Sequence, residues 1–180
     1  MNSKTLIKEK EQEIVSKWHK AVIDSYPLDS GKFLLGNKDR FANPIGYSLS
    51  EELPKIFKQL TGEMNIELLR ASLDEIIKIR AVQNFAPSEA VGFLYFLKDI
   101  VRSELKNMTI DDNLISSYFE FESRVDRALM MSFEIYLDKK MKISEIRTNE
   151  IKKRNQRMVN RLSEKYGIAE EVNDDLNLNN

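Results

Sequence analysis

Residues 111–137 read DDNLISSYFEFESRVDRALMMSFEIYL, and residues 138–166 continue as DKKMKISEIRTNEIKKRNQRMVNRLSEKY. Neither glycine nor proline occurs between Phe93 and Gly167, so nothing in these two runs forces a helix to end. Two aspartates and Thr109 stand where a helix N-terminus prefers acidic and capping side chains. We therefore predict one long C-terminal helix over residues 111–165.

The two runs differ in composition. The first is rich in apolar and aromatic side chains up to Tyr136, which predicts a core helix. The second is mostly charged, and its remaining apolar residues form a weak heptad seam, with Met141, Thr148, Asn155 and Leu162 at a and Leu137, Ser144, Ile151 and Met158 at d. We expect a dimer or output helix that uses Ile143, Ile151, Asn155, Met158 and Leu162. A solvated helix folded onto its own domain is the alternative.

Four shorter helices are expected upstream, at residues 4–25, 50–60, 65–83 and 87–106, because apolar side chains recur there at helical spacing. The third of them places the charged Arg80 on its inward face, together with Ile66, Leu69, Leu73, Ile76 and Ile77. Strand signals are absent. The fold class is therefore all-α, a single bundle of five to six helices with a long C-terminal helix.

Three regions follow along the chain. A helical domain is expected over residues 1–137, and the C-terminal helix continues from it over residues 138–166. Residues 167–180 are acidic and rich in asparagine, which predicts a disordered tail. Residues 28–47 contain three glycines and Pro44, so we expect a loop there.

Composition excludes several classes of protein. The chain has 180 residues, a formal net charge of −1 and no cysteine, so disulfides, thiolate metal sites and cysteine nucleophiles are absent. No signal peptide or membrane-spanning run is recognisable. We expect a cytoplasmic protein without cofactor or membrane partner. Phosphate-binding loops, nucleophile elbows and zinc spacings are also missing, so we expect no enzyme.

His19 is the only histidine. One interpretation is phosphotransfer, because histidine-phosphotransfer domains are helical bundles with one exposed histidine. The other is an ordinary, partly buried histidine at the edge of the first helix's apolar face, and this interpretation is favoured. A di-iron bundle would need two Glu-x-x-His pairs, and none occurs.

Aromatic side chains could surround a small apolar ligand. We single out Trp18, His19, Phe93, Phe96 and Phe121 as candidates for a pocket or for the core, and aromatics at helical spacing are more often core. The carboxylates of Glu120, Glu122 and Asp126 lie on one helix beside arginines, which indicates a salt-bridged surface rather than acid–base catalysis.

Residues 139–165 contain ten lysines and arginines against three glutamates, a local charge of about +7. Nucleic-acid binding is one interpretation of such a run. Few aromatic or polar base-reading side chains are interleaved with the basic ones, so a solvated or protein-binding helix is favoured.

Several segments together resemble one family, the RsbRD N-terminal domain. They are Trp18-His19 with Tyr26-Pro27, DRFANP at residues 39–44, RAVQNFAPSEA at residues 80–90 with 93–99, and FEIY at residues 133–136 leading to EIRTNE at residues 145–150. The resemblance implies a bacterial, non-haem, globin-like sensor module of the stressosome type, which dimerises and precedes an output domain. It implies a signalling-protein partner and a signalling helix at residues 133–162, and it assigns no catalytic residues.

Overall fold

The computed structural model describes residues 9–26, 41–83, 85–106 and 112–167. These residues form five helices, α2 (Glu11–Asp24), α4 (Pro44–Thr61), α5 (Ile66–Val82), α6 (Pro87–Leu105) and α7 (Asp112–Tyr166), and contain no strand. The predicted all-α class and the long C-terminal helix are confirmed. None of the described helices is both long and apolar enough to cross a membrane. The chain falls into two units, residues 1–140 and residues 141–180.

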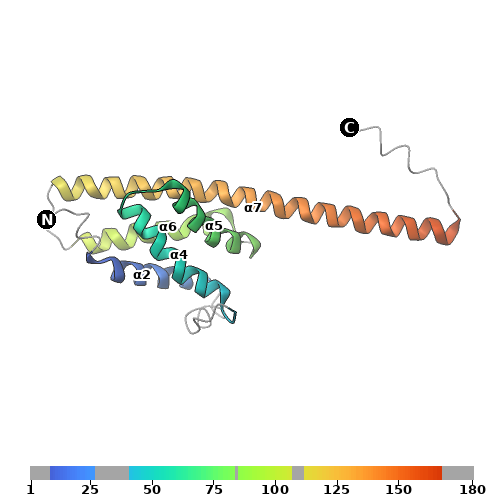
Figure 1. The fold of residues 1–180 in the computed structure, drawn as a ribbon, viewed down its shortest axis with the longest axis horizontal. Coiled ribbons are helices and arrows are strands. Elements are labelled where there is room, and N and C mark those ends of the chain that lie inside the picture. Colours follow the sequence, from blue (N-terminus) through green and yellow to red (C-terminus); the bar gives the residue numbers. More distant parts are fainter. Residues whose placement is uncertain (1–8, 27–40, 84, 107–111, 168–180) are drawn as a thin grey trace. The chain divides into compact units, whose positions relative to one another are not determined.

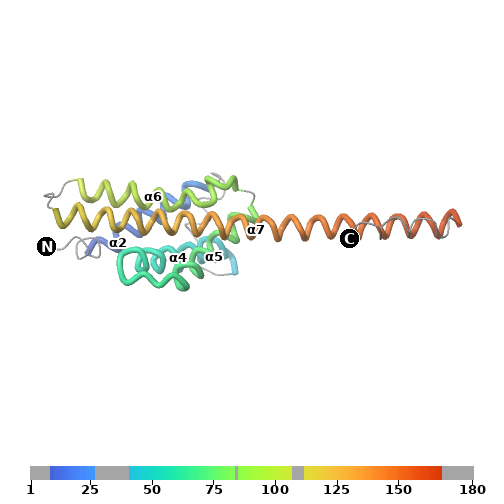
Figure 2. Tube along the Cα trace, turned by 90° about the horizontal axis from the view of Figure 1, so that it is seen from above, coloured from blue at the N-terminus to red at the C-terminus, as the bar shows by residue number. Residues whose placement is uncertain are grey.

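Within the first unit, α4 packs against α5 and α2, while α6 packs against α2 and α5 (Figure 1). α6 and the first part of α7 run antiparallel to each other (Figure 2). Lys98 of α6 bonds Asp126 of α7 at 2.8 Å, and Arg102 bonds Glu122 at 3.0 Å. The core between the helices is built from buried side chains that include Trp18, Leu53, Phe57, Leu73, Ile76, Phe93, Leu97 and Val125.

Local capping decides where two of the helices begin. Asn65 accepts hydrogen bonds from the backbone N–H groups of Glu67 and Leu68, so α5 begins close to the predicted position. The expected loop at residues 28–47 is wrong at its end, because α4 already begins at Pro44. Asn43 caps it by accepting from the Gly46 N–H at 2.9 Å, and proline suits the first turn of a helix.

The last helix ends where predicted. α7 stops at Tyr166, and the following Gly167 has a φ of 64°, a left-handed conformation that favours glycine. The expected beginning of this helix at Thr109 to Asp111 lies outside the described residues, as do the beginning of the first expected helix, residues 28–40 of the expected loop and the expected disordered tail.

α7 buries only one face in the first unit. That face contains Phe121, Val125, Ala128, Ser132, Ile135 and Tyr136. The prediction that this apolar half is core throughout is wrong, because Phe119 and Met130 are 62% and 63% exposed. The neighbouring helices cover a single side of α7, so apolar residues on its other side remain in solvent.

Candidate functional site

The most unusual buried group in the first unit is the guanidinium of Arg80, in the last turn of α5. Helical spacing places Arg80 on the same face as Leu73, Ile76 and Ile77, and the side chain is 0% exposed. Three aromatic rings surround it. The Arg80 Cζ lies 5.0 Å from the centre of the Tyr26 ring, 4.9 Å from that of Phe85 and 5.3 Å from that of Phe93. We call these four residues the Arg80 cluster.

Arg80 has few hydrogen-bond partners. Its Nη1 donates to the backbone carbonyl of Glu89 at 2.9 Å, and its Nη2 donates to Ser25 Oγ at 3.0 Å. Its Nε is buried and has no partner among the described residues, and no described carboxylate forms an ion pair with it. Burial lowers the pKa of Arg80, but a guanidinium stays protonated in proteins. The cluster therefore holds a buried positive charge that forms no ion pair, although the Glu89 carboxylate lies near enough to act on it through space.

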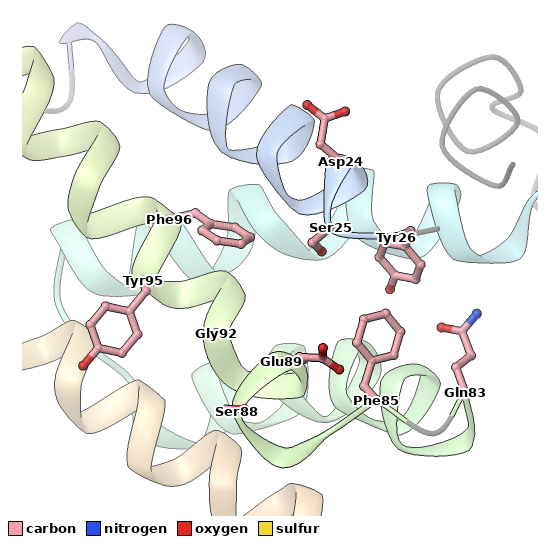
Figure 3. A pocket seen from close by; sticks show the side chains of 10 residues that line it. All are labelled: Asp24, Ser25, Tyr26, Gln83, Phe85, Ser88, Glu89, Gly92, Tyr95 and Phe96. Carbon is pink, nitrogen blue, oxygen red and sulfur yellow. The ribbon is translucent and has the colours of Figure 1, made fainter. Parts of the chain in front are cut away.

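A surface pocket of about 940 Å³ adjoins the cluster (Figure 3). It lies where α2 ends and α6 begins, and it is lined by Asp24, Ser25, Tyr26, Gln83, Phe85, Ser88, Glu89, Gly92, Tyr95 and Phe96. Tyr26 is 5% exposed, and its hydroxyl lies close to the Arg80 guanidinium but forms no hydrogen bond of good geometry with any described residue. Burial raises the pKa of Tyr26, and the neighbouring Arg80 offsets part of this rise.

The cluster is connected to α7 through Phe85. The backbone carbonyl of Phe85 accepts a hydrogen bond from the Tyr136 hydroxyl at 2.6 Å, and Tyr136 is buried on α7. The Phe85 ring itself packs edge-on against Tyr26, with centres 5.2 Å apart. A displacement of Phe85 would therefore act on both the pocket wall and α7.

The aromatic candidates do not form one site. Trp18 and Phe93 are fully buried and stacked, with ring centres 6.0 Å apart, and Trp18 Nε1 donates to the Phe93 carbonyl at 2.7 Å. Phe121 is buried on α7. Phe96 alone among the five candidates lines the pocket of Figure 3.

His19 is half-buried on α2, beside Trp18. Its Nε2 is buried and has no hydrogen-bond partner among the described residues. Burial lowers the pKa of His19 below its ordinary value of 6.5. Because the Nε2 is buried, phosphotransfer at that atom would first require the His19 side chain to turn outward.

The three carboxylates of α7 are paired, as predicted. Glu120 bonds Arg124 at 2.5 Å, and Glu122 and Asp126 bond Arg102 and Lys98 of α6. Within the described residues, no group of three or more metal-ligating side chains occurs.

In the second unit, the candidate interface residues are exposed in the single chain. Ile151 is 60% exposed, Met158 53% and Leu162 48%; Asn155 is also exposed, and Ile143 is half-buried. Their role in a dimer or an output helix stays a prediction.

Sequence reasoning missed Tyr26 and Phe85 and did not assign a role to Arg80. A usable signal was present, since an arginine stands on an otherwise apolar helix face, and such a buried charge needs compensation. The rings that surround it come from the residues just after α2, from α6 and from the connection before α6, and this convergence depends on tertiary packing.

A known protein family matches most of the chain. The model of the RsbT co-antagonist protein rsbRD N-terminal domain matches residues 12–150. The chain belongs to this family. The match includes α2, α4, α5, α6 and the larger part of α7, and so confirms the resemblance carried by the sequence motifs. RsbRD N-terminal domains are signalling modules. Neither the curated proteins nor the solved structures contain a match to the chain.

Proposed function

We propose that the chain is a non-enzymatic, cytoplasmic sensor that passes a signal through its C-terminal segment, residues 138–166, to a signalling-protein partner. Membership of a family of RsbT co-antagonist domains supports a regulatory role. The Arg80 cluster supplies the sensing part, because it combines a pocket with buried polar groups that lack partners. The single observation that carries the proposal is the hydrogen bond between Tyr136 and the Phe85 carbonyl.

This hydrogen bond gives the proposal a physical route. Phe85 contacts Tyr26 on one side and is bonded to α7 on the other. Four residues after this bond, Lys140 ends the first unit. Lys139 is also fixed to α5, through an ion pair with Asp74 at 2.6 Å. A change at the pocket that moves Phe85 would therefore alter how α7 is fixed where the C-terminal segment starts.

We further propose that the C-terminal segment pairs two copies of the chain in parallel. The positions of its seam alternate at four-residue and three-residue intervals, and five of the eight are apolar. Asn155 occupies an a position, where asparagine fixes a parallel two-stranded register. The exposure of Ile151, Met158 and Leu162 leaves this seam available to a second copy.

The test is the oligomeric state of the full chain with one seam residue made acidic. Ile151→Glu should convert a dimer into a monomer, because it buries a carboxylate against an apolar partner. Ile146→Glu is the matched control, since Ile146 is 59% exposed on the same helix but lies outside the seam. Light scattering at matched concentration measures both, and monomeric wild type or dimeric Ile151→Glu would contradict pairing through this seam.

Nucleic-acid binding through the basic residues 139–165 is the alternative use of this segment. The two functions respond to salt in opposite ways. Pairing of two segments whose residues 139–165 each carry about +7 strengthens as salt screens their repulsion. Binding to phosphates weakens steeply with salt, because counter-ions are released. Association measured across a salt series therefore separates the two.

A further inference from the structure

The pocket of Figure 3 contains a buried hydroxyl whose bonding the fold leaves incomplete. Tyr26 lines the pocket, and its hydroxyl points toward the Phe85 side of it and forms no hydrogen bond of good geometry with any described residue. Behind the Tyr26 and Phe85 rings lies Arg80, whose Nε has no partner among the described residues. Buried polar groups are nearly always bonded. The Tyr26 hydroxyl therefore indicates a ligand that accepts its hydrogen bond, and the nearby charge of Arg80 favours a ligand that is negatively charged.

We propose that this pocket binds a small organic carboxylate with a flat apolar body. The Tyr26 hydroxyl donates a hydrogen bond to the carboxylate. Arg80 is a positioning residue, since it supplies positive charge from behind the wall and touches the ligand at no point. The apolar body packs against the aromatic side chains that line the same pocket, Phe85, Tyr95 and Phe96.

The chemistry of Tyr26 suits this role. Burial raises the pKa of its hydroxyl, so the group remains a proton donor at neutral pH. A hydrogen bond to a charged acceptor is stronger than one to a neutral acceptor. The Tyr26 hydroxyl therefore favours a carboxylate over a neutral amide of the same shape.

Two carboxylates of the protein line the pocket as well, and they would favour a cation. Both are exposed, and the Glu89 carboxylate already accepts from the backbone N–H of Ala86 at 3.0 Å. In Figure 3 the Asp24 carboxylate points away from the Tyr26 and Phe85 rings. Water screens exposed charges far more than a buried one. The buried Arg80 therefore decides the sign of the preferred ligand.

The pocket has room for such a molecule. Its volume of about 940 Å³ suits a drug-sized ligand. On its α6 side, a Cβ built on Gly92 would meet no atom within 4 Å, which leaves open space for a ring. The pocket is therefore large enough for a benzyl group with one short acidic arm.

Three probes that share one benzyl body test the charge preference. Phenylacetate, phenylacetamide and phenethylamine are titrated into the full chain, and binding is measured by ligand-observed NMR. Phenylacetate should bind at least about tenfold more tightly than the amide, a difference of one charge-assisted hydrogen bond. Phenethylamine should bind most weakly. Preferred binding of the amine, equal binding of acid and amide, or no binding of phenylacetate at concentrations up to about 10 mM overturns the proposal.

Two variants locate the binding. Tyr26→Phe keeps the ring and removes the hydroxyl, so phenylacetate affinity should fall about tenfold. Tyr118→Phe is the matched control, because it also removes one tyrosine hydroxyl but lies outside the lining of this pocket, and this variant should bind as wild type does. Far-UV circular dichroism checks that both remain folded. Wild-type affinity in folded Tyr26→Phe would show that the hydroxyl is not the recognition group.

The role of Arg80 is tested separately. Arg80→Met removes the charge and keeps a long side chain, and replacement of a buried charge by an apolar residue is often tolerated. This variant should show a clearly reduced preference for phenylacetate over phenylacetamide, because the charge of Arg80 no longer adds to the hydrogen bond from Tyr26. A folded Arg80→Met that keeps the full preference contradicts the role given to Arg80. Binding at this pocket does not require transmission through residues 138–166. Absence of ligand binding would therefore overturn the pocket proposal alone, and absence of transmission would overturn the proposed function alone.

Discussion

At position 80 the fold buries a guanidinium that forms no ion pair with any described carboxylate, and three aromatic rings take the place of a counter-ion. A cation over an aromatic face is stabilised by the ring's quadrupole. The aromatic rings do not fully replace the hydration that the Arg80 guanidinium loses on burial, because only two of its nitrogens have hydrogen-bond partners. The Arg80 cluster is therefore an electrostatically incomplete site inside an otherwise apolar core.

At the scale of single residues, His19 also provides a prediction about how the stability of the fold depends on pH. Its pKa is lowered in the folded chain, so the unfolded chain takes up a proton first as the pH falls below 6.5. The free energy of unfolding should therefore fall between about pH 7.5 and about pH 5.5. His19→Gln should remove this part of the decline, measured by guanidinium denaturation across that range. If the free energy of unfolding depends on pH equally in the variant and in wild type, His19 contributes nothing to the decline.

At the scale of the elements, the sequence predicted both ends of α5 and α6 and the last residues of α7 closely, because capping side chains, proline and glycine act locally. It misplaced the beginning of α4. Pro44 and Gly46 suggested a loop, but Asn43 caps the helix and the proline occupies its first turn. The burial of α7 was also not predictable in detail, since Phe119 and Tyr136 are equally suited to a core. Which of them is covered depends on where α4, α5 and α6 pack.

The cap of α5 provides a prediction about stability. Asn65→Ala removes an acceptor for two backbone N–H groups and should lower the free energy of unfolding by about 1 kcal/mol. Asn149→Ala, at an exposed position inside α7, should be neutral or slightly stabilising because alanine favours the helix. Chemical denaturation of both variants measures the difference. If Asn65→Ala lowers the free energy of unfolding by no more than Asn149→Ala does, the capping role of Asn65 is contradicted.

At the scale of the whole molecule, the chain combines a packed helical domain with a charged C-terminal segment. The formal charge of the chain is −1, and the basic run contributes about +7, so the remainder carries about −8. The domain contains the Arg80 cluster and the pocket, while the segment contains the exposed seam. Function, as we propose it, depends on communication between these two parts through α7, and the Tyr136 hydrogen bond is where that communication begins.

Hydrogen exchange on the full chain tests this communication most directly. Tyr136→Phe removes the bond to the Phe85 carbonyl, and Tyr118→Phe is the control, because the Tyr118 hydroxyl bonds only Arg102 and Glu122 among the described residues. We predict faster amide exchange in Tyr136→Phe both at residues 80–90 and at residues 138–166, and no change in residues 138–166 for Tyr118→Phe. Faster exchange confined to residues 80–90, with residues 138–166 as in wild type, would contradict transmission from the Arg80 cluster to the C-terminal segment.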